Sequence, residues 1–359
     1  LDASECYSDY REFFCSPKKA DAVMICTPEN MHFEPCMLAI QAGYHVLLEK
    51  PIAQKLEECQ AIAEAAREKG VIVVVCHVLR YHPYFMKIKE LVDSGELGNI
   101  ITINHRTLVG IDRMTHSFVR GPWRRESESN PMLVSKCCHD LDFLLWMTKT
   151  RCRKLSSFGS LRWFKSANAP EGSALRCLDC RVETKCPFSA VDLYRNRHEW
   201  ISNFDVPPGK NIDDVIEDQL QEGPYGRCVY HCDNDVVDHQ IVSMEMESGV
   251  TINFSMAIFT LEDKRETHIC LTEGEIDGDE TSLRVYRFKG GTKTVYDFSH
   301  LHGAPFHAGA DLALMADFVD AIQKGRQGLV TSIERSVESH RICYEAERSR
   351  KENRTVLFE

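Results

Sequence analysis

A lysine between a carboxylate and a proline ends one of the apolar runs of this chain. The run is Tyr44–Leu48, and the tripeptide that follows is Glu49-Lys50-Pro51. Proline stiffens the turn and can aim the ammonium of Lys50, and partial desolvation would lower its pKa toward a value useful for acid–base chemistry. Taken alone, the tripeptide also fits a solvated lysine that simply ends a strand.

A second candidate for proton transfer is His139, within the stretch Lys136-Cys-Cys-His-Asp-Leu-Asp142. On a helix, Lys136, His139 and Phe143 share one face through i, i+3 and i+7 spacing. Histidine changes its charge near neutral pH, so the pattern predicts His139 as an acid or base. The alternative is a histidine that caps or packs within an apolar helix.

Apolar strands that alternate with amphipathic helices must position these residues. The expected strands are Ala22–Cys26, Tyr44–Leu48 and Val71–Cys76, and the expected helices are Met31–Ala42, Lys55–Lys69 and Tyr84–Ser94. Such alternation indicates a parallel sheet flanked by helices. Ligands bind outside the carboxyl ends of such strands, which directs attention to Thr27-Pro28, to Glu49-Lys50-Pro51 and to His77.

The pattern changes after Gly98 to strands of period two, at Ile100–His105, Val237–Met246 and Val250–Phe259, with a further hairpin around Gly290-Gly291. These strands predict an antiparallel sheet. Two helices are expected to close the chain, Asp311–Lys324 and Ser332–Lys351, the second opened by Thr331 and Glu334 in capping-box spacing. We therefore expect a partial, doubly wound domain over residues 1–98 and an α+β domain with a large open sheet over residues 99–359, whose last helices pack back on the first domain.

Composition narrows the classes of function. The 359 residues hold 43 Lys+Arg against 54 Asp+Glu, a formal net charge of −11, which argues against a nucleic-acid partner. The longest apolar runs are far shorter than the ~20 residues that a membrane helix requires, so no membrane partner is expected. Most of the 16 cysteines are scattered singly in apolar stretches, and we expect a reducing cytoplasm.

Five cysteines form a separate cluster, Cys177-x-x-Cys180, Cys186 and Cys228-x-x-x-Cys232. Soft thiolates at such spacing suit tetrahedral zinc, and we predict a structural site made of Cys177, Cys180, Cys186 and Cys232, with Cys228 as a substitute. The same thiols are compatible with an iron–sulfur cluster. The simpler alternative is a set of reduced thiols in a polar loop.

Several of these motifs together resemble the Gfo/Idh/MocA oxidoreductases, nicotinamide-dependent enzymes that act on sugars and cyclitols. They are Thr27-Pro-Glu-Asn-Met-His32, Ala42-Gly-Tyr-His-Val-Leu-Leu-Glu-Lys-Pro51, Val92-Asp-Ser-Gly-Glu-Leu-Gly98, Lys136-Cys-Cys-His-Asp-Leu-Asp142 and His307-Ala-Gly-Ala-Asp311. The resemblance implies a Rossmann domain that binds NAD or NADP, followed by an open-sheet domain. It implies a cofactor contact by Thr27, Pro28, Asn30, His32, Glu49, Lys50 and Pro51.

The resemblance also implies roles at the reacting carbon. Lys50 and His139 would bracket the sugar carbinol, one of them taking the hydroxyl proton as hydride leaves, and Lys136 would contribute electrostatically. Substrate contacts would come from Arg80, Tyr81, Trp123, Arg124 and His307, because aromatic rings stack on sugar faces and arginine fixes hydroxyls or carboxylates. A homo-oligomer is expected, since the open sheet of such proteins commonly packs against a second subunit.

Two departures from the family pattern stand out. No Gly-x-Gly-x-x-Gly turn, which holds the pyrophosphate in family members, occurs in the sequence, and we infer an N-terminally truncated chain. Ser135 stands where many relatives carry an aspartate four residues before the histidine. The leading function is a dehydrogenase that oxidises a secondary hydroxyl of a sugar, sugar derivative or cyclitol. The alternatives are a redox-neutral, NAD-dependent glycoside hydrolase and an inactive fragment.

Overall fold

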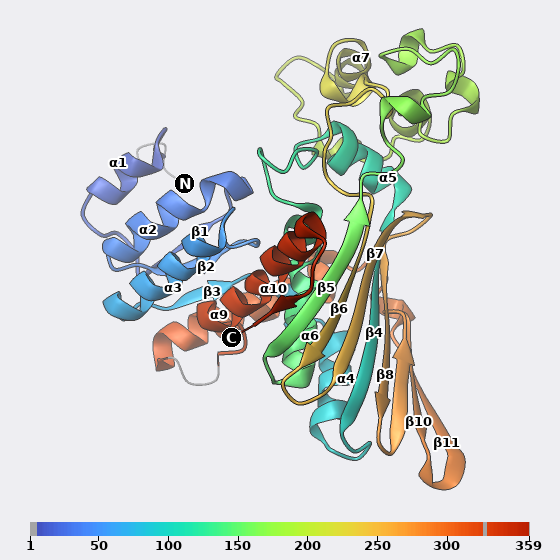
Figure 1. Ribbon diagram of the computed structural model, residues 1–359. Helices are drawn as coiled ribbons and strands as arrows, with labels where there is room; N and C mark the ends of the chain where they lie inside the picture. Colours follow the sequence, from blue (N-terminus) through green and yellow to red (C-terminus); the bar gives the residue numbers. More distant parts are fainter. Residues whose placement is uncertain (1–5, 326–328, 359) are drawn as a thin grey trace.

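Two β-sheets organise the computed structural model, which describes residues 6–325 and 329–358 (Figure 1). The first sheet has three parallel strands in the order β1-β2-β3: β1 (Ala22–Ile25), β2 (His45–Leu48) and β3 (Val73–Val75). Helices α2 (Phe33–Gln41) and α3 (Leu56–Lys69) share one hydrophobic core with these strands, and α9 (Ala310–Lys324) packs against Leu47 and Val74 in another. The parallel sheet is therefore covered by helices on both faces.

Local sequence explains the ends of these elements. Helix α3 ends at Gly70, whose φ of 68° lies in the left-handed region that glycine adopts without strain. The helix predicted from Met31 begins two residues later, at Phe33, because a 3-10 turn over Glu29–Met31 precedes it. A short helix, α1 (Tyr10–Cys15), lies beside α2 and is capped by Asp9, whose side chain accepts a hydrogen bond from the backbone N–H of Arg11.

The second sheet has nine strands in the order β11-β10-β9-β8-β4-β7-β6-β5-β12. Only β4 and β7 pair in parallel, and every other pair is antiparallel. The strands are β4 (Ile100–Gly110), β5 (Cys152–Ser160), β6 (His239–Met246), β7 (Thr251–Thr260), β8 (Lys264–Leu271), β9 (Gly274–Gly278), β10 (Ser282–Arg287), β11 (Thr292–Asp297) and β12 (Val356–Leu357). A three-stranded parallel sheet followed by a large, mainly antiparallel sheet confirms the predicted fold class.

One face of the large sheet carries the main hydrophobic core. Residues alternate between buried and exposed along β6 and β7, and the buried set packs against α4 (Pro83–Asp93), α6 (Met132–Thr148) and α10 (Ile333–Glu352). The other face is open and exposes apolar side chains such as Phe158, Ile241 and Phe259. In Figure 1 the strands fan out beside α6 and α10, with no helix on their far side.

The last helix links the two sheets, because it contacts both α3 and α6. The backbone N–H of Ile52 donates to His340 Nε2 at 3.0 Å, and the Tyr344 hydroxyl donates to the carbonyl oxygen of Ala53 at 2.7 Å. The predicted capping box at its start is wrong. The residue that caps α10 is Ser332 rather than Thr331, and no side chain there accepts a capping hydrogen bond.

Residues 161–238 form an insertion between β5 and β6 that projects from one end of the large sheet (Figure 1). It consists of 3-10 and π-helical turns and one longer helix, α7 (Ile212–Gln221), with a small core of its own around Leu193, Tyr194 and Ile216. The adjoining α5 (Ile111–Arg113) and a π-helical turn over Met114–Arg120 join this insertion to β4. A further short helix, α8 (Pro305–Ala308), precedes α9.

A buried ion pair joins the loop after β3 to α6. Arg80, 4% exposed, donates to both carboxylate oxygens of Asp142 at 2.6 and 2.8 Å, and it also donates to the carbonyl oxygen of Val330 at 2.9 Å. Although burial alone would raise the pKa of Asp142, the nearby His77 and Arg80 hold it below its usual value.

Over the described part of the chain, no helix is both long and apolar enough to cross a membrane.

We predict that Arg80→Ala lowers the free energy of unfolding by about 3–5 kcal/mol, because it leaves the Asp142 carboxylate buried without its counter-ion. Urea denaturation measures the effect. Arg195→Ala, which removes an exposed pair with Glu217, is the matched control and should cost no more than about 1 kcal/mol. Arg80→Met with Asp142→Leu should recover much of the loss. Equal stability of Arg80→Ala and Arg195→Ala would contradict the structural role of the buried pair.

Candidate active site

A cavity of about 470 Å³ opens at the carboxyl ends of β1 and β2. Six of the seven residues predicted to contact a cofactor line it, namely Thr27, Pro28, Asn30, His32, Glu49 and Lys50. The opposite wall comes from the segment before α6 and includes Pro122, Trp123 and Ser129. The cavity thus lies where an open parallel sheet binds its ligands, and both halves of the chain contribute to it.

The histidine of the first motif fixes the shape of this cavity. His32 is buried, and its two ring nitrogens lie 2.7 Å from the carbonyl oxygen of Pro51 and 2.8 Å from that of Thr27. The ring therefore ties the loop after β1 to the loop after β2. Pro51, the seventh predicted cofactor residue, is buried and does not line the cavity, so its contribution is the carbonyl oxygen that holds His32.

Sequence reasoning missed the carboxylate at the centre of the site. Glu29 is 9% exposed and accepts three hydrogen bonds of 2.8 Å, from Trp123 Nε1, Asn130 Nδ2 and Ser135 Oγ. All three donors come from the segment that leads into α6 and from its first turn. Ser135 therefore binds a carboxylate that the loop after β1 supplies. Only the position of Glu29 inside the Thr-Pro motif could have signalled it.

Lys50 reaches the same helix. Its ammonium donates to the backbone carbonyl oxygen of Ser135 at 2.9 Å, so the strand-end lysine meets the first turn of α6. The two candidates for acid–base chemistry, Lys50 and His139, are thereby brought to neighbouring positions, and the Lys50 charge is among the groups that lower the pKa of His139.

His139 belongs to a group of three histidines between β3, α6 and α10. The His77 ring centroid lies 5.5 Å from that of His139 and 5.7 Å from that of His340. Burial lowers the pKa of His77 to about 4 and of His340 to about 3, and burial together with the Lys50 charge lowers the pKa of His139 well below its usual value. His139 is therefore neutral at pH 7, and its Nδ1 has no hydrogen-bond partner among the described residues.

Lys136, on the same helix, lies close to a second cavity. This cavity, of about 400 Å³, is lined by residues that include His82, Asp263, Arg265 and His307. The Lys136 ammonium lies 3.8 Å from Asp263, and burial, with the charges of Arg113 and Arg265, lowers its pKa to about 7. This amine can gain or lose a proton near neutral pH.

The structure brings only part of the predicted substrate set to these cavities. Trp123 lines the first cavity and His307 lines the second. The His307 side chain is exposed, and its Nδ1 is hydrogen-bonded to the Asp311 carboxylate. Arg80 and Tyr81 line neither. Arg80 is held by Asp142, and the Tyr81 hydroxyl donates to Asp317 at 2.6 Å, so the polar groups of both residues bind other parts of the protein. The Arg80 guanidinium is buried, and the Asp142 carboxylate on α6 balances its charge.

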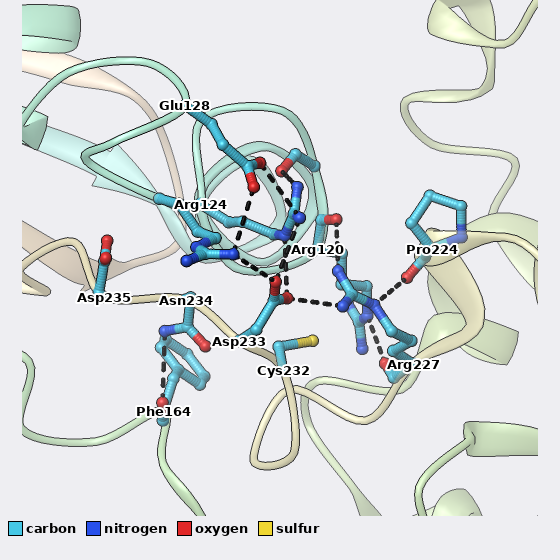
Figure 2. A network of polar contacts seen from close by, with 12 residues as sticks. Arg120, Arg124, Glu128, Phe164, Pro224, Arg227, Cys232, Asp233, Asn234 and Asp235 are labelled. Carbon is cyan, nitrogen blue, oxygen red and sulfur yellow. Dashed lines mark hydrogen bonds and ion pairs between the residues drawn. The ribbon is translucent and has the colours of Figure 1, made fainter.

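Arg124, the remaining substrate candidate, belongs to a network around Asp233 (Figure 2). The Asp233 carboxylate accepts from Arg124 at 2.9 and 3.1 Å and from Arg227 at 2.7 Å, and Arg125 lies 3.8 Å away. Hydrogen bonds from Arg124 and Arg227 hold the pKa of Asp233 well below its usual value. This network, here called the Asp233 clamp, ties the insertion to the segment that carries Trp123.

The predicted zinc site is not supported by the geometry. Four thiolates around a zinc ion lie within about 4 Å of one another. Across residues 6–325 and 329–358, the only group of three potential ligands whose donor atoms all lie within 4.8 Å does not include any of the five cysteines of the insertion. Instead, the Cys177 thiol accepts from the backbone N–H of Ala190 at 3.5 Å, and the Cys232 thiol donates to the carbonyl oxygen of Cys228 at 3.3 Å.

Comparison with known proteins identifies the family. Residues 2–77 match the model described as "Oxidoreductase family, NAD-binding Rossmann fold", and residues 85–184 match the GFO/IDH/MocA C-terminal domain. The chain belongs to the Gfo/Idh/MocA oxidoreductase family. This Gfo/Idh/MocA protein is similar to YteT of Bacillus subtilis, which is named as an oxidoreductase, at 22% identity over 73% of this chain and 61% of YteT. The match thus spans less than two thirds of that relative.

Shorter and more distant matches agree with the family. The scyllo-inositol 2-dehydrogenase (NADP(+)) IolW of Bacillus subtilis is 42% identical over 82 residues, 23% of each chain. An oxidoreductase from Agrobacterium radiobacter, solved with NAD+, L-tartaric acid and magnesium, superposes with a TM-score of 0.69 at 16% identity, covering 98% of this chain and 83% of that one. Myo-inositol 2-dehydrogenase from Lactobacillus plantarum gives 0.64 at 17% identity, with 98% and 84% covered. At this identity the structures show the shared fold.

We predict that the stability of the protein rises with pH above 7 because of Lys136. The folded state releases the Lys136 proton near pH 7, whereas an unfolded lysine keeps it to about pH 10.4, so the unfolded state binds more protons in this window. One proton contributes up to about 1.4 kcal/mol per pH unit. Urea denaturation at pH 6.5 and 9 should show that Lys136→Met is more stabilising at the lower pH. An advantage that does not change with pH would contradict the lowered pKa.

A further prediction concerns the Asp233 clamp. Asp233→Ala removes the carboxylate that holds Arg124 and Arg227, so amide hydrogen exchange over residues 121–130 should accelerate by about tenfold or more, as expected for a local loss of stability. Hydrogen exchange with mass spectrometry measures this. Glu217→Ala, which breaks an ion pair elsewhere on the insertion, should leave residues 121–130 unchanged. Equal exchange in both variants would show that the clamp does not hold this segment.

Proposed function

We propose that the protein is an NAD(P)-dependent dehydrogenase that oxidises a secondary hydroxyl of a sugar, sugar derivative or cyclitol. The observation that carries the proposal is the 2.9 Å hydrogen bond from the Lys50 ammonium to the carbonyl oxygen of Ser135. It joins the strand-end lysine to the helix that carries His139, at the edge of a cavity in a domain that matches an NAD-binding family. Inositol dehydrogenases are among the proteins that this chain resembles, and this similarity supports a polyhydroxylated ring as the substrate class.

The cavity residues fit the nicotinamide end of a dinucleotide. The walls combine the strand-end loops of β1 and β2 with the indole of Trp123, which the Glu29 carboxylate, itself part of the lining, holds by a hydrogen bond. A dinucleotide bound here would supply the hydride acceptor for the reaction. The pyrophosphate would depend on a glycine-rich turn, which these 359 residues do not contain.

The neutral state of His139 decides the direction of proton transfer in this proposal. A neutral imidazole has one unprotonated ring nitrogen, which can accept the hydroxyl proton of the substrate as the C–H bond breaks, and the cationic Lys50 would hydrogen-bond the same oxygen and stabilise its developing negative charge. Lys136, three residues before His139 on α6, would add positive charge near it when protonated. His139 and Lys136 lie on one face of α6, and Lys50 lies at the strand end that meets this helix. Each of the three side chains would thus have a separate task.

Lys50→Ala tests the proposal. We expect kcat for inositol or sugar oxidation to fall by at least ~10², the usual contribution of one donor that stabilises a developing oxyanion, with little change in thermal stability. Absorbance at 340 nm with NAD+ or NADP+ measures turnover over a panel of inositols and sugars. Lys55→Ala, which removes an exposed lysine paired with Glu58, is the control. Near-normal turnover of Lys50→Ala would remove Lys50 from the mechanism.

The same assay separates the alternatives that the sequence left open. Cleavage of aryl glycosides without a net change at 340 nm would identify a redox-neutral glycoside hydrolase. Failure of the chain to bind either nucleotide would favour an inactive fragment. A rise at 340 nm with free polyols supports the dehydrogenase.

A further inference from the structure

Three different metal-ligating side chains meet on the open face of the large sheet. His268 and Cys270 lie two residues apart on β8, so their side chains point to the same side of the sheet. Glu275 on β9 is the register partner of Cys270, which places its carboxylate beside them. None of the three lines either of the cavities described above.

The three donor atoms converge on one point. His268 Nε2 lies 3.1 Å from Glu275 Oε2 and 4.0 Å from Cys270 Sγ, and all three atoms are within 4.8 Å of one another. Zinc binds nitrogen and oxygen at about 2.0–2.2 Å and sulfur at about 2.3 Å, so the ligands of a tetrahedral site are about 3.3–3.8 Å apart. The distances from His268 Nε2 to the other two donors, 3.1 and 4.0 Å, lie on either side of that range.

The surroundings leave this point without a competing cation. Asp277, the register partner of His268, is paired with Arg284, and the residues opposite His268 and Cys270 on β4 are the uncharged Asn104 and Thr102. In the described part of the chain, the Glu275 carboxylate forms an ion pair with His268 and with no lysine or arginine.

We propose that His268, Cys270 and Glu275 form a Zn²⁺ site that joins β8 to β9. A set of one nitrogen, one sulfur and one oxygen donor favours a borderline cation such as zinc over magnesium or calcium, which prefer oxygen ligands alone. The His268 and Glu275 side chains are each 37% exposed, so a water molecule can complete the tetrahedron from the solvent side. The Cys270 thiol is the donor that distinguishes this site from a simple ion pair between His268 and Glu275.

Cobalt substitution tests the site directly. Chelator-treated protein titrated with Co²⁺ should develop a near-ultraviolet thiolate charge-transfer band and the visible bands of tetrahedral cobalt, saturating at one equivalent and disappearing when Zn²⁺ is added. In Cys270→Ser the thiolate band should be lost, and the dissociation constant for Co²⁺ should rise by at least about tenfold. Catalytic activity should not change, because the site lies outside both cavities.

Two cysteine controls make the outcome specific. Cys15→Ser removes an exposed thiol near the N-terminus, and Cys180→Ser removes one of the insertion thiols; both should retain the band. Absence of the band in the wild-type protein, its persistence in Cys270→Ser, or its loss in Cys180→Ser would overturn the proposal. If Cys270→Ser does not fold, as judged by circular dichroism, His268→Gln and Glu275→Gln replace it, and each should weaken the visible bands and the affinity.

Discussion

The burial of helix α6 is the constraint on which the rest of the structure depends. The helix is covered by the large sheet, by α10 and by the loops of the parallel sheet, yet it carries Ser135, Asp140 and Asp142 at buried positions. Buried polar groups are stable only with partners, so each of them selects a contact from another element. Asp142 binds Arg80, Asp140 binds Arg265 and His105, and Ser135 binds Glu29. These bonds fix the helix between the two sheets.

The same constraint sets the charges near His139. Burial favours neutral imidazole, and the neighbouring cations Lys50, Arg265 and Lys136 act in the same direction. Two aspartates on the same helix do not offset this effect, because Arg80 and Arg265 already pair with them. The packing that holds the helix therefore also determines which protonation state the histidine presents.

Periodic features of the sequence predicted most of the fold. The strands and helices from Ala22 to Asp93 were predicted from apolar periods, and their observed ends differ from the predicted ones by up to two residues. The prediction works because burial of the apolar faces is what stabilises these elements. The strand-end motifs likewise placed Lys50 and the Thr27 loop at one cavity. Contacts between distant side chains could not be predicted in this way. Arg80 follows a strand as a ligand-binding residue would, but its guanidinium is paired with Asp142. No pattern in the sequence linked Glu29 or Asp233 to their hydrogen-bond partners.

The origin of the central carboxylate has a consequence for motion between the two sheets. Glu29 belongs to the loop after β1, whereas Trp123, Asn130 and Ser135 all belong to the chain that leads into α6 or begins it. An aspartate on the helix itself would stay with its neighbours whenever the halves of the molecule separated. Glu29 would instead lose all three hydrogen bonds together if the two halves separated, so one side chain couples the loop after β1 to the whole segment that leads into α6.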